Sequence, residues 1–497
     1  MQNRSLEREI KLAVSANFHL PDLDGAYDNV TAHPQGVKRY TTTYYDTSDF
    51  RLARWGCSLR YRDGHGWTLK LPEPSEDETV MFRTEYVYDD PPGEPPSPAL
   101  DLVAAMVRRA NVRVVARMSA IRRTIELRSD ATPLAEVTDD VVSVVHAKKV
   151  VRRFREIEVE LAQGGPLPLL DAVAQRLRAA GASAPHQLPK IVQAIGRRAA
   201  APPDVEPVEP DPDGSALSVI RHALARSMQR LIQHDPLVRG GSDAEAVHQA
   251  RVATRRLRSD LRTFRPLLVK NWTDSLHRRL REAANALGAV RDADVFIERL
   301  NAAAAKLPVA DRVDAGAIVS DHAAQRARRH ETLLAVLRSE EYLELLDDLV
   351  EAAARPHVVR AAVRPAVDAL PALLADQWKK ARRAATSAQR LQSDDALHRL
   401  RIRTKRCRYA MDAVVPVVGK KAKAFAAAAG KLQQVLGKHH DAVVAHGLLR
   451  EYAKSTTSFA AGELAMIEWR AVGKARKSWH ACWEKVAAAR QRFGSWS

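Results

Sequence analysis

The chain has 497 residues, 46% of them hydrophobic, and a formal net charge of +18. One hydrophobic core does not extend over such a length, so two or more domains are expected. No run approaches the ~18 to 20 apolar residues of a membrane span, the first residues predict no signal peptide, and three scattered cysteines argue against a disulfide framework and for a cytoplasmic protein.

Charged and apolar residues alternate in the first predicted strand. Glu7, Glu9 and Lys11 share one face, because side chains at i, i+2 and i+4 of a strand point the same way. The alternation returns with three carboxylates, at Glu156, Glu158 and Glu160. Like charges on one strand face repel each other. A positive ion is therefore expected there, and a divalent metal with hard oxygen ligands is the natural candidate.

The same alternation marks further strands in residues 1–200. The candidate strands are Leu6–Val14, Lys38–Asp46, Ser58–Arg62, Trp67–Leu71, Met81–Tyr88, Ser119–Leu127, Leu134–Val144 and Phe154–Leu161. Helices are expected near Pro98–Ala110 and Leu167–Ala180. About eight antiparallel strands with charge on one face favour a barrel with a polar interior.

Further charged residues would meet in the lumen of such a barrel. The cations are Arg60, Arg62, Lys70, Arg83, Arg122 or Arg123, and Lys190; the added carboxylates are Glu85, Glu136 and Asp140. Arg and Lys bind phosphoryl oxygens while carboxylates bind metal, so this mixture suits a metal–polyphosphate substrate. A solvated strand face is the alternative for any single strand.

A segment rich in proline and acid, residues 201–215, follows these strands. It can form neither a helix nor a central strand, and we interpret it as a semi-rigid extended linker. Residues 1–200 hold 28 basic and 26 acidic residues, whereas residues 201–497 hold 50 and 34. The excess of positive charge in the second part predicts a polyanionic partner: nucleic acid, an anionic membrane or a phosphate polymer.

Residues 216–497 are rich in Ala, Leu, Arg and Val, which predicts helix bundles. An internal repeat is present: Ala246–Arg258 matches Ala396–Arg408 at an offset of 150, with six of thirteen positions identical. A second pair of matching segments is Leu287-Gly288…Asp292 and Leu436-Gly437…Asp441. We therefore predict two related bundles, about 216–360 and 361–497, with pseudo-two-fold symmetry.

Each repeat carries a stripe of cations along one helix face, at spacings of three and four. The stripes are His248, Arg251, Arg255, Arg258 and Arg262 in the first repeat, and His398, Arg401, Lys405 and Arg408 in the second. A polyanion would offset the repulsion within each stripe. A solvated basic face, salt bridges to acidic helices or structural histidines are the alternatives. Aromatic residues form only 5% of the chain, which disfavours nucleic acid.

The first 200 residues resemble a CYTH domain of the triphosphate tunnel metalloenzyme superfamily. The matching segments are Glu7-x-Glu9-x-Lys11, Tyr44–Thr47, Leu52–Arg54, Gly56–Arg62, Thr68–Lys70, Arg83–Glu85, Arg122–Thr124, Glu136–Asp140, Glu156–Glu160 and Leu188–Lys190. Residues 216–497 resemble a CHAD domain, the conserved histidine α-helical domain, through both histidine–arginine segments and both Leu-Gly…Asp segments.

The resemblance implies an α+β multidomain protein: an eight-stranded antiparallel β-barrel that forms a triphosphate tunnel, and an all-α pair of helix bundles. It also implies metal-dependent hydrolysis of inorganic triphosphate with Mg²⁺ or Mn²⁺, and polyphosphate binding by the helical part. The alternatives are an organic triphosphate (thiamine triphosphate, or ATP hydrolysis or cyclisation) and a non-catalytic polyphosphate-binding protein. We expect no nucleic acid partner and no membrane span, with a cytoplasmic location and attachment to polyphosphate granules; the oligomeric state stays open.

Each residue then has an expected role. The catalytic set is Glu7, Glu9, Lys11, Glu158 and Glu160; all but Lys11 hold the metal, with Glu85, Glu136, Asp140 and Glu156 as further candidates. The triphosphate ligands are Lys11, Arg60, Arg62, Lys70, Arg83, Arg123 and Lys190. Arg122 against Arg123, and Asp139 against Asp140, stay open by one residue. The two cationic stripes are the polyphosphate site.

Overall fold

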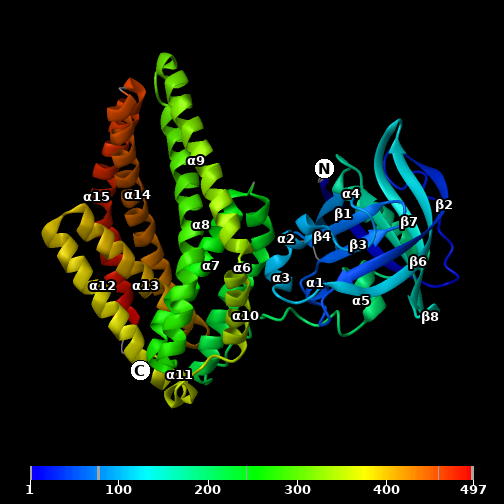
Figure 1. Cartoon of the computed structure of the whole chain (residues 1–497), viewed down its shortest axis with the longest axis horizontal. Coiled ribbons are helices and arrows are strands. Elements are labelled where there is room, and N and C mark those ends of the chain that lie inside the picture. Colours follow the sequence, from blue (N-terminus) through cyan, green and yellow to red (C-terminus); the bar gives the residue numbers. More distant parts are fainter. Residues whose placement is uncertain (1–2, 75–78, 242, 457, 494–497) are drawn as a thin grey trace. The chain divides into compact units, whose positions relative to one another are not determined.

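The computed structural model describes residues 3–74, 79–241, 243–456 and 458–493 (Figure 1). Contacts divide the chain into two compact units, Met1–Asp204 and Val205–Ser497. The first contains the strands and a few short helices, and the second is helical, which confirms the predicted α+β multidomain class. None of the described helices is long and apolar enough to cross a membrane.

The strands of the first unit pair antiparallel into a closed barrel in the order β1-β5-β4-β3-β2-β6-β7-β8. Their bounds are β1 Asn3–Val14, β2 Val30–Asp46, β3 Ser58–Arg62, β4 Gly66–Pro72, β5 Met81–Tyr88, β6 Arg113–Ser129, β7 Thr132–His146 and β8 Lys149–Leu161. Every strand expected from the alternation is present. Three of them, β2, β6 and β8, begin several residues earlier than predicted, because their first parts are largely solvent-exposed and lack the apolar face that marks a strand.

The alternation of β1 separates two environments. Glu7 and Lys11 point into the lumen, whereas Ile10 and Leu12 pack on the outside of the wall, in an apolar cluster with helix α4 (Leu167–Ala179). Residues on the outer face of β8 join the same cluster. The main apolar core of this unit therefore lies between the wall and α4, which leaves much of the lumen to polar side chains.

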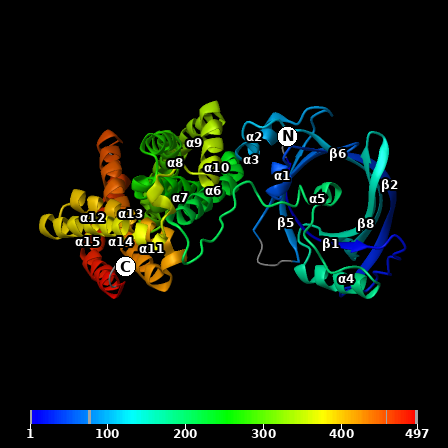
Figure 2. The ribbon, with the colours of Figure 1, turned by 90° about the horizontal axis from the view of Figure 1, so that it is seen from below.

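Helix α5 (Lys190–Ile195) lies inside the ring of strands (Figure 2). Ile191 and Val192 of this helix pack with Met118 and Ala120 of β6, so α5 fills part of the lumen with apolar contacts. The remaining short helices of the unit are α1 Arg51–Arg54, α2 Ser97–Leu102 and α3 Ala104–Val107. The helix expected near Pro98–Ala110 is thus two short helices, α2 and α3.

Residues 201–214 form no helix or strand. The segment is nevertheless attached at both ends. The carboxylate of Asp204 accepts a hydrogen bond from Trp55 Nε1 at 3.0 Å and pairs with Arg108 in the first unit. In the second unit, the carbonyl oxygen of Val208 lies 3.1 Å from Nδ1 of His222. The segment therefore makes side-chain contacts near each of its ends, and its role as a semi-rigid extended linker stays a prediction.

The second unit is built from two sets of helices that follow the same order. The first set is α6 Ala216–Gly240, α7 Ala244–Thr263, α8 Lys270–Ala304 and α9 Arg312–Arg338; the second is α12 Pro371–Leu391, α13 Asp394–Val418, α14 Lys420–Thr456 and α15 Phe459–Phe493. Between the sets lie α10 Glu340–Ala354 and α11 Ala366–Ala369, and short 3-10 turns occur at Arg265–Leu267, Val309–Asp311 and Arg360–Val363.

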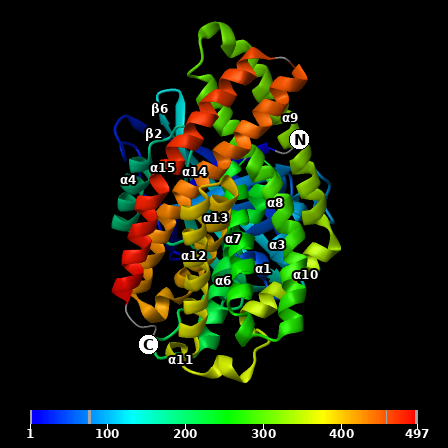
Figure 3. The same ribbon diagram turned by 90° about the vertical axis from the view of Figure 1, so that its left-hand side faces the viewer.

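Helices α7 and α13 carry the two repeated segments, and they lie side by side (Figure 3). Each begins with a side-chain cap: the carboxylate of Asp243 accepts from two backbone N–H groups of α7, and the hydroxyl of Ser393 accepts from one of α13. Such caps satisfy backbone donors that the first turn leaves without partners. The matched caps start the two cationic stripes at equivalent points.

Candidate functional site

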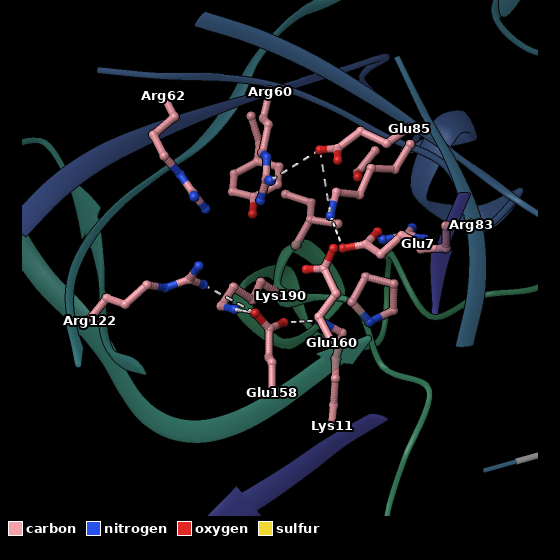
Figure 4. Close-up of a pocket in the computed structure, with 15 residues that line it drawn as sticks. Glu7, Lys11, Arg60, Arg62, Arg83, Glu85, Arg122, Glu158, Glu160 and Lys190 are labelled. Carbon is pink, nitrogen blue, oxygen red and sulfur yellow. Dashed lines mark hydrogen bonds and ion pairs between the residues drawn. The ribbon is translucent and has the colours of Figure 1, made fainter. Parts of the chain in front are cut away.

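A polar cavity of about 190 Å³ lies in the lumen of the barrel (Figure 4). Seven cations and four carboxylates are among its lining residues, and the cations therefore outnumber the acids. The lining consists of Glu7, Lys11, Tyr44, Ser58, Arg60, Arg62, Lys70, Arg83, Glu85, Arg122, Glu158, Glu160, Pro189, Lys190 and Ile191. A cavity of this charge favours a polyanion, with carboxylates placed to hold a cation beside it.

Three carboxylates gather at one side of this lumen. Oxygens of Glu7, Glu9 and Glu160 all lie within 4.8 Å of one another. Strand pairing creates the cluster, because Glu9 of β1 lies directly opposite Glu160 of β8. Among the described residues, Glu7 Oε2 and Glu9 Oε1 are buried without a hydrogen-bond partner. Buried oxygens in that state fit a hard divalent cation such as Mg²⁺ or Mn²⁺.

The members of this cluster differ in pKa. Burial, together with the charges of Glu7 and Glu9, raises the pKa of Glu160 to about 8. Burial alone would also raise the pKa of Glu9, but Lys11 and other nearby cations outweigh it and lower that pKa to about 2. Near neutral pH the cluster therefore retains a proton, mainly on Glu160, because a further negative charge there is unfavourable.

Cations face this cluster across the lumen. Lys70 forms an ion pair with Glu7 and lies 3.8 Å from Glu85. Arg60 lies 3.9 Å from the same Glu85 oxygen. Arg83 donates a hydrogen bond of 2.8 Å to the carbonyl oxygen of Gly56, which fixes its guanidinium at the cavity wall. Side chains from β1, β3, β4 and β5 thus converge on one volume.

Lys190, the first residue of α5, is the centre of a second network. Its Nζ lies 2.9 Å from Asp140, 2.8 Å from Glu156 and 2.7 Å from Glu158. Burial would lower the pKa of Lys190, but Asp140 and Glu156 raise it overall. Lys11 also pairs with Glu158, and its own pKa is lowered by burial. Asp140 and Glu156 are therefore held by cations here, and neither lines the cavity.

The adjacent arginines of β6 point in opposite directions. Arg122 lines the cavity and donates to both oxygens of Asp140, at 2.8 and 2.6 Å. The Arg123 side chain is 66% exposed and lies 4.0 Å from Asp139 on the outer side of the wall. Asp139 is itself held by Arg155 at 2.8 Å. Of the two arginines that the sequence left open, Arg122 faces the lumen and Arg123, the predicted ligand, does not; Asp140 is the inward member of its doublet.

Other expected residues also differ in position. Glu136 lies opposite Glu160 in the strand register but is exposed and does not line the cavity. Glu9 lies behind the lining, where Lys11 Nζ approaches it at 3.0 Å. Glu85 lines the cavity beside cations, and it is absent from the three-carboxylate cluster.

Three polar residues of the lumen were not among the expected ligands. Tyr44 and Ser58 line the cavity, and the ring of Tyr40 lies 4.2 Å from the Arg62 guanidinium carbon. Tyr40 and Tyr44 share a face of β2, because they are four residues apart on a strand. That spacing is visible in the sequence, but an aromatic residue at such a position is equally common in a core. Arg60 lowers the pKa of Tyr44 against the opposing effect of burial.

The helical unit holds a second charged cavity, of about 390 Å³. Its lining comes from α7, α8, α9, α13 and α14. The lining consists of His248, Arg251, Arg255, Arg291, Asp292, Ala293, Val295, Phe296, Arg299, His322, Gln325, Arg329, Arg401, His440, Asp441, Val444 and Leu448. Four of the nine predicted polyphosphate ligands thus line it: His248, Arg251, Arg255 and Arg401. The lining residues that were not among the predicted ligands come chiefly from α8, α9 and α14. Four of them, Arg291, Asp292, His440 and Asp441, lie in the second pair of matching segments, 287–292 and 436–441.

The other predicted members of the stripes lie outside this lining. Lys405 is close to it: burial, followed by repulsion from Arg255 and other arginines, lowers the pKa of Lys405 to about 6. His398 lies 3.1 Å from His440, Nδ1 to Nδ1. Arg262 Nη2 lies 3.0 Å from the ring of His277. The remaining two are Arg258 and Arg408.

A closed eight-stranded barrel with opposed cations and carboxylates in its lumen defines a tunnel protein suited to a polyanion. Residues 5–191 match the CYTH domain family, and residues 222–450 match the CHAD domain family. The chain belongs to the family of proteins that join a CYTH domain to a CHAD domain. CYTH proteins generally act on triphosphates and typically depend on a divalent metal. The carboxylates of Glu7, Glu9 and Glu160 are close enough together to offer ligands to one ion.

Two proteins of Mycobacterium tuberculosis match along nearly the whole chain. "Uncharacterized protein MT2285" of strain CDC 1551 / Oshkosh is 31% identical over 488 residues, which cover 90% of this chain and 89% of that protein. "Uncharacterized protein Rv2226" of strain ATCC 25618 / H37Rv is 30% identical over 488 residues, with the same coverage of both chains.

Solved structures are similar over parts of the chain. PptA from Streptomyces chartreusis has a TM-score of 0.47 and 21% identity, and the match covers 55% of this chain and 100% of that one. The CHAD domain from the plant Ricinus communis has a TM-score of 0.45 and 24% identity, covering 57% and 96%.

Proposed function

We propose that the barrel hydrolyses inorganic triphosphate and that the helical unit binds polyphosphate. The observation that carries the first part is the opposition, within one closed lumen, of the carboxylate cluster Glu7, Glu9 and Glu160 to a wall of arginines and lysines. A linear triphosphate presents many phosphoryl oxygens and needs both partners, a metal and cationic side chains.

Glu7, Glu9 and Glu160 are the proposed metal ligands, with Glu158 beside them. Mg²⁺ or Mn²⁺, when bound, neutralises phosphate charge and lowers the pKa of a water molecule. The ion pair between Lys70 and Glu7 positions the cation and the carboxylate next to each other. On binding, Lys70 would turn its charge to a phosphoryl oxygen while Glu7 retains a positive partner.

The chain's own cations bind and orient the substrate. Arg60, Arg62 and Arg122 line the part of the cavity away from the carboxylate cluster, as their positions in Figure 4 indicate. Burial and the nearby Arg60 lower the pKa of Arg62 to about 10, so it stays charged at neutral pH. Fixed guanidinium groups stabilise the charge that spreads over a phosphoryl group during transfer, without reorganising at that moment.

The first test is phosphate release from tripolyphosphate, thiamine triphosphate and ATP, measured in parallel with Mg²⁺ or Mn²⁺ and with an EDTA control. Glu7→Gln is the inactivating variant, and Glu126→Gln is its matched control, because Glu126 pairs with Arg128 rather than lining the cavity. We expect metal-dependent release from tripolyphosphate that Glu7→Gln abolishes. Release from ATP or thiamine triphosphate alone would assign an organic substrate instead.

The helical cavity supports the second part of the proposal. Arginines from α7, α8, α9 and α13 converge there with three histidines, one each from α7, α9 and α14. Arg251 pairs with Asp292 at 2.8 Å, while the burial and mutual repulsion around Lys405 indicate cations in excess of acids. An extended phosphate chain would supply the missing negative charge. If the protein bound polyphosphate but released no phosphate from any triphosphate, it would be a polyphosphate-binding protein and not a hydrolase.

A further inference from the structure

A third cavity, of about 550 Å³, lies between helices α14 and α15. Its lining is His446, Arg450, Ala453, Lys454, Gly462, Ala465, Met466 and Trp469; we call it the α14–α15 groove. It is separate from the charged cavity of about 390 Å³ that we propose as the polyphosphate site. Val444 and Leu448 of α14 line that cavity, whereas His446 and Arg450 of the same helix line the α14–α15 groove. Residues two positions apart lie on nearly opposite sides of a helix. One helix therefore presents two different faces to two different cavities.

An exposed aromatic platform forms one end of the groove. Trp469 is 52% exposed and Met466 is 51% exposed, both on α15. The ring of His446 from α14 lies against the indole of Trp469, with 5.3 Å between ring centroids. Gly462 and Ala465, which have no side chain and a methyl group respectively, line the groove beside it. An indole that is supported from one side and open on another is a surface on which a flat ring can stack.

Cations continue from this platform along α14. Arg450 and Lys454 follow His446 at intervals of four residues, so the three share one helix face, and they lie about 6 and 12 Å along the axis from it. No carboxylate of the described residues is within 4.0 Å of the Arg450 guanidinium; Lys454 pairs with Glu451 at 3.0 Å. Residues 361–497 hold 26 basic and 10 acidic residues, against 24 and 24 in residues 201–360. The groove therefore lies in the strongly basic repeat.

We propose that the α14–α15 groove binds a nucleotide, with its base stacked on Trp469 and its phosphates on Arg450 and Lys454. A ring platform followed at one and two helical turns by cations matches the separation of base and phosphates in a nucleoside diphosphate. The volume lies in the ~300 to 1,000 Å³ range of small-molecule pockets. An amphipathic helix would instead need a longer apolar groove. This inference is independent of the proposed triphosphatase and polyphosphate functions.

The test measures ADP binding to the full-length chain by equilibrium dialysis. EDTA prevents hydrolysis, and excess tripolyphosphate competes for any site that binds ADP through its phosphates alone, so that base-dependent binding can be measured. We expect ADP to bind under these conditions and pyrophosphate to compete poorly. Binding of ADP no tighter than that of pyrophosphate would overturn the proposal, because the base would then contribute nothing and binding would require phosphate contacts alone.

Two variants locate the site. Trp469→Leu removes the stacking surface but keeps an apolar residue, and Arg450→Gln removes an exposed charge; each should weaken ADP binding by roughly tenfold or more. Lys431→Gln, an exposed charge elsewhere on α14, is the matched control and should bind as the unaltered chain does. Unchanged affinity in Trp469→Leu would refute the assignment. Binding of an acidic amphipathic peptide without binding of ADP would also refute it and make the groove a peptide site.

Discussion

Arg122 and Arg123 are neighbours in β6, yet one reaches Asp140 inside the barrel at 2.6 Å while the other projects from the outer wall with a 66% exposed side chain. This separation makes the pair a built-in comparison. Substitution of either arginine by glutamine removes one positive charge from the same strand, but only substitution of Arg122 removes it from the lumen.

We therefore expect Arg122→Gln to lower kcat/KM for tripolyphosphate by roughly 10²-fold, the size of effect seen when a fixed donor to a transition-state oxygen is lost. Arg123→Gln should remain within about twofold of the unaltered chain, because it changes only long-range screened charge. Steady-state kinetics of both variants decide the question. Equal losses in the two would remove Arg122 from the phosphate site.

Lys190 neutralises a group of buried carboxylates, and its removal should destabilise the barrel unit. Lys190→Gln leaves Asp140, Glu156 and Glu158 close together without their shared cation. Loss of one partner from a buried ion network typically costs about 3–5 kcal/mol. The thermal transition of the barrel unit, followed by calorimetry on the whole chain, should shift to lower temperature.

The control for this variant is Lys149→Gln, an exposed lysine at the start of β8, which should leave the transition unchanged. Adding Glu156→Gln to Lys190→Gln should recover part of the loss, because it removes one of the stranded charges. A double variant as unstable as the single one, or less stable, would contradict the electrostatic explanation.

Polyphosphate affinity should depend on pH through Lys405. Burial and the nearby arginines lower the pKa of Lys405 to about 6, so at pH 7 the free protein holds this lysine largely neutral. A bound polyanion favours the charged form and raises its pKa. Binding therefore takes up a proton above pH 6, and affinity falls as pH rises, by up to about tenfold per pH unit while the bound form stays protonated.

Titration calorimetry in buffers of different ionisation enthalpy measures this proton uptake directly. In Lys405→Gln the proton uptake at pH 7 should disappear, and affinity should change little between pH 6.5 and 8. Proton uptake that persists in this variant would assign the linkage to another group.

Removal of one arginine from each repeat tests whether the charged cavity of the helical unit binds polyphosphate. Arg251→Gln combined with Arg401→Gln takes two cations from the cavity lining. We expect polyphosphate affinity to fall more than tenfold and its dependence on salt concentration to become shallower, because fewer counterions are released on binding. The control is Arg390→Gln, an exposed residue of α12. An unchanged salt dependence in the double variant would exclude this cavity as the site.

Much of the barrel could be predicted from the sequence, because the wall has only two sides and side chains alternate between them. The carboxylates of β1 and β8 followed directly from that period of two. The orientation of two adjacent residues of like charge did not follow from it. For Arg122 and Arg123, the period of two predicts that one side chain faces inward, but the register of the partner strands decides which one. Nor could the sequence reveal that Lys190, which lies on a helix far along the chain, forms ion pairs with Asp140 and Glu156.

The helical unit was predictable to a different extent. The repeated segment located α7 and α13 because its spacing of three and four is a local property of one helix. Which residues line the cavity, however, depends on how the neighbouring helices pack. Arg291 and His440 lie in the second pair of matching segments, on α8 and α14. The repeat does not show, however, that these residues and Arg329 of α9 meet Arg251 in one cavity. The stripes were also longer than the cavity, so Arg258 and Arg408 fell outside its lining.

Helix α14 is a wall common to two cavities, with Val444 and Leu448 facing one and His446 and Arg450 facing the other. Any displacement or rotation of this helix alters both walls at once. If an occupant of one cavity favours a particular position of α14, it changes the affinity of the other cavity by a defined factor, and the reverse effect must be equal in size. Helix α14 would then couple binding at the two cavities, although the two ligands do not contact each other.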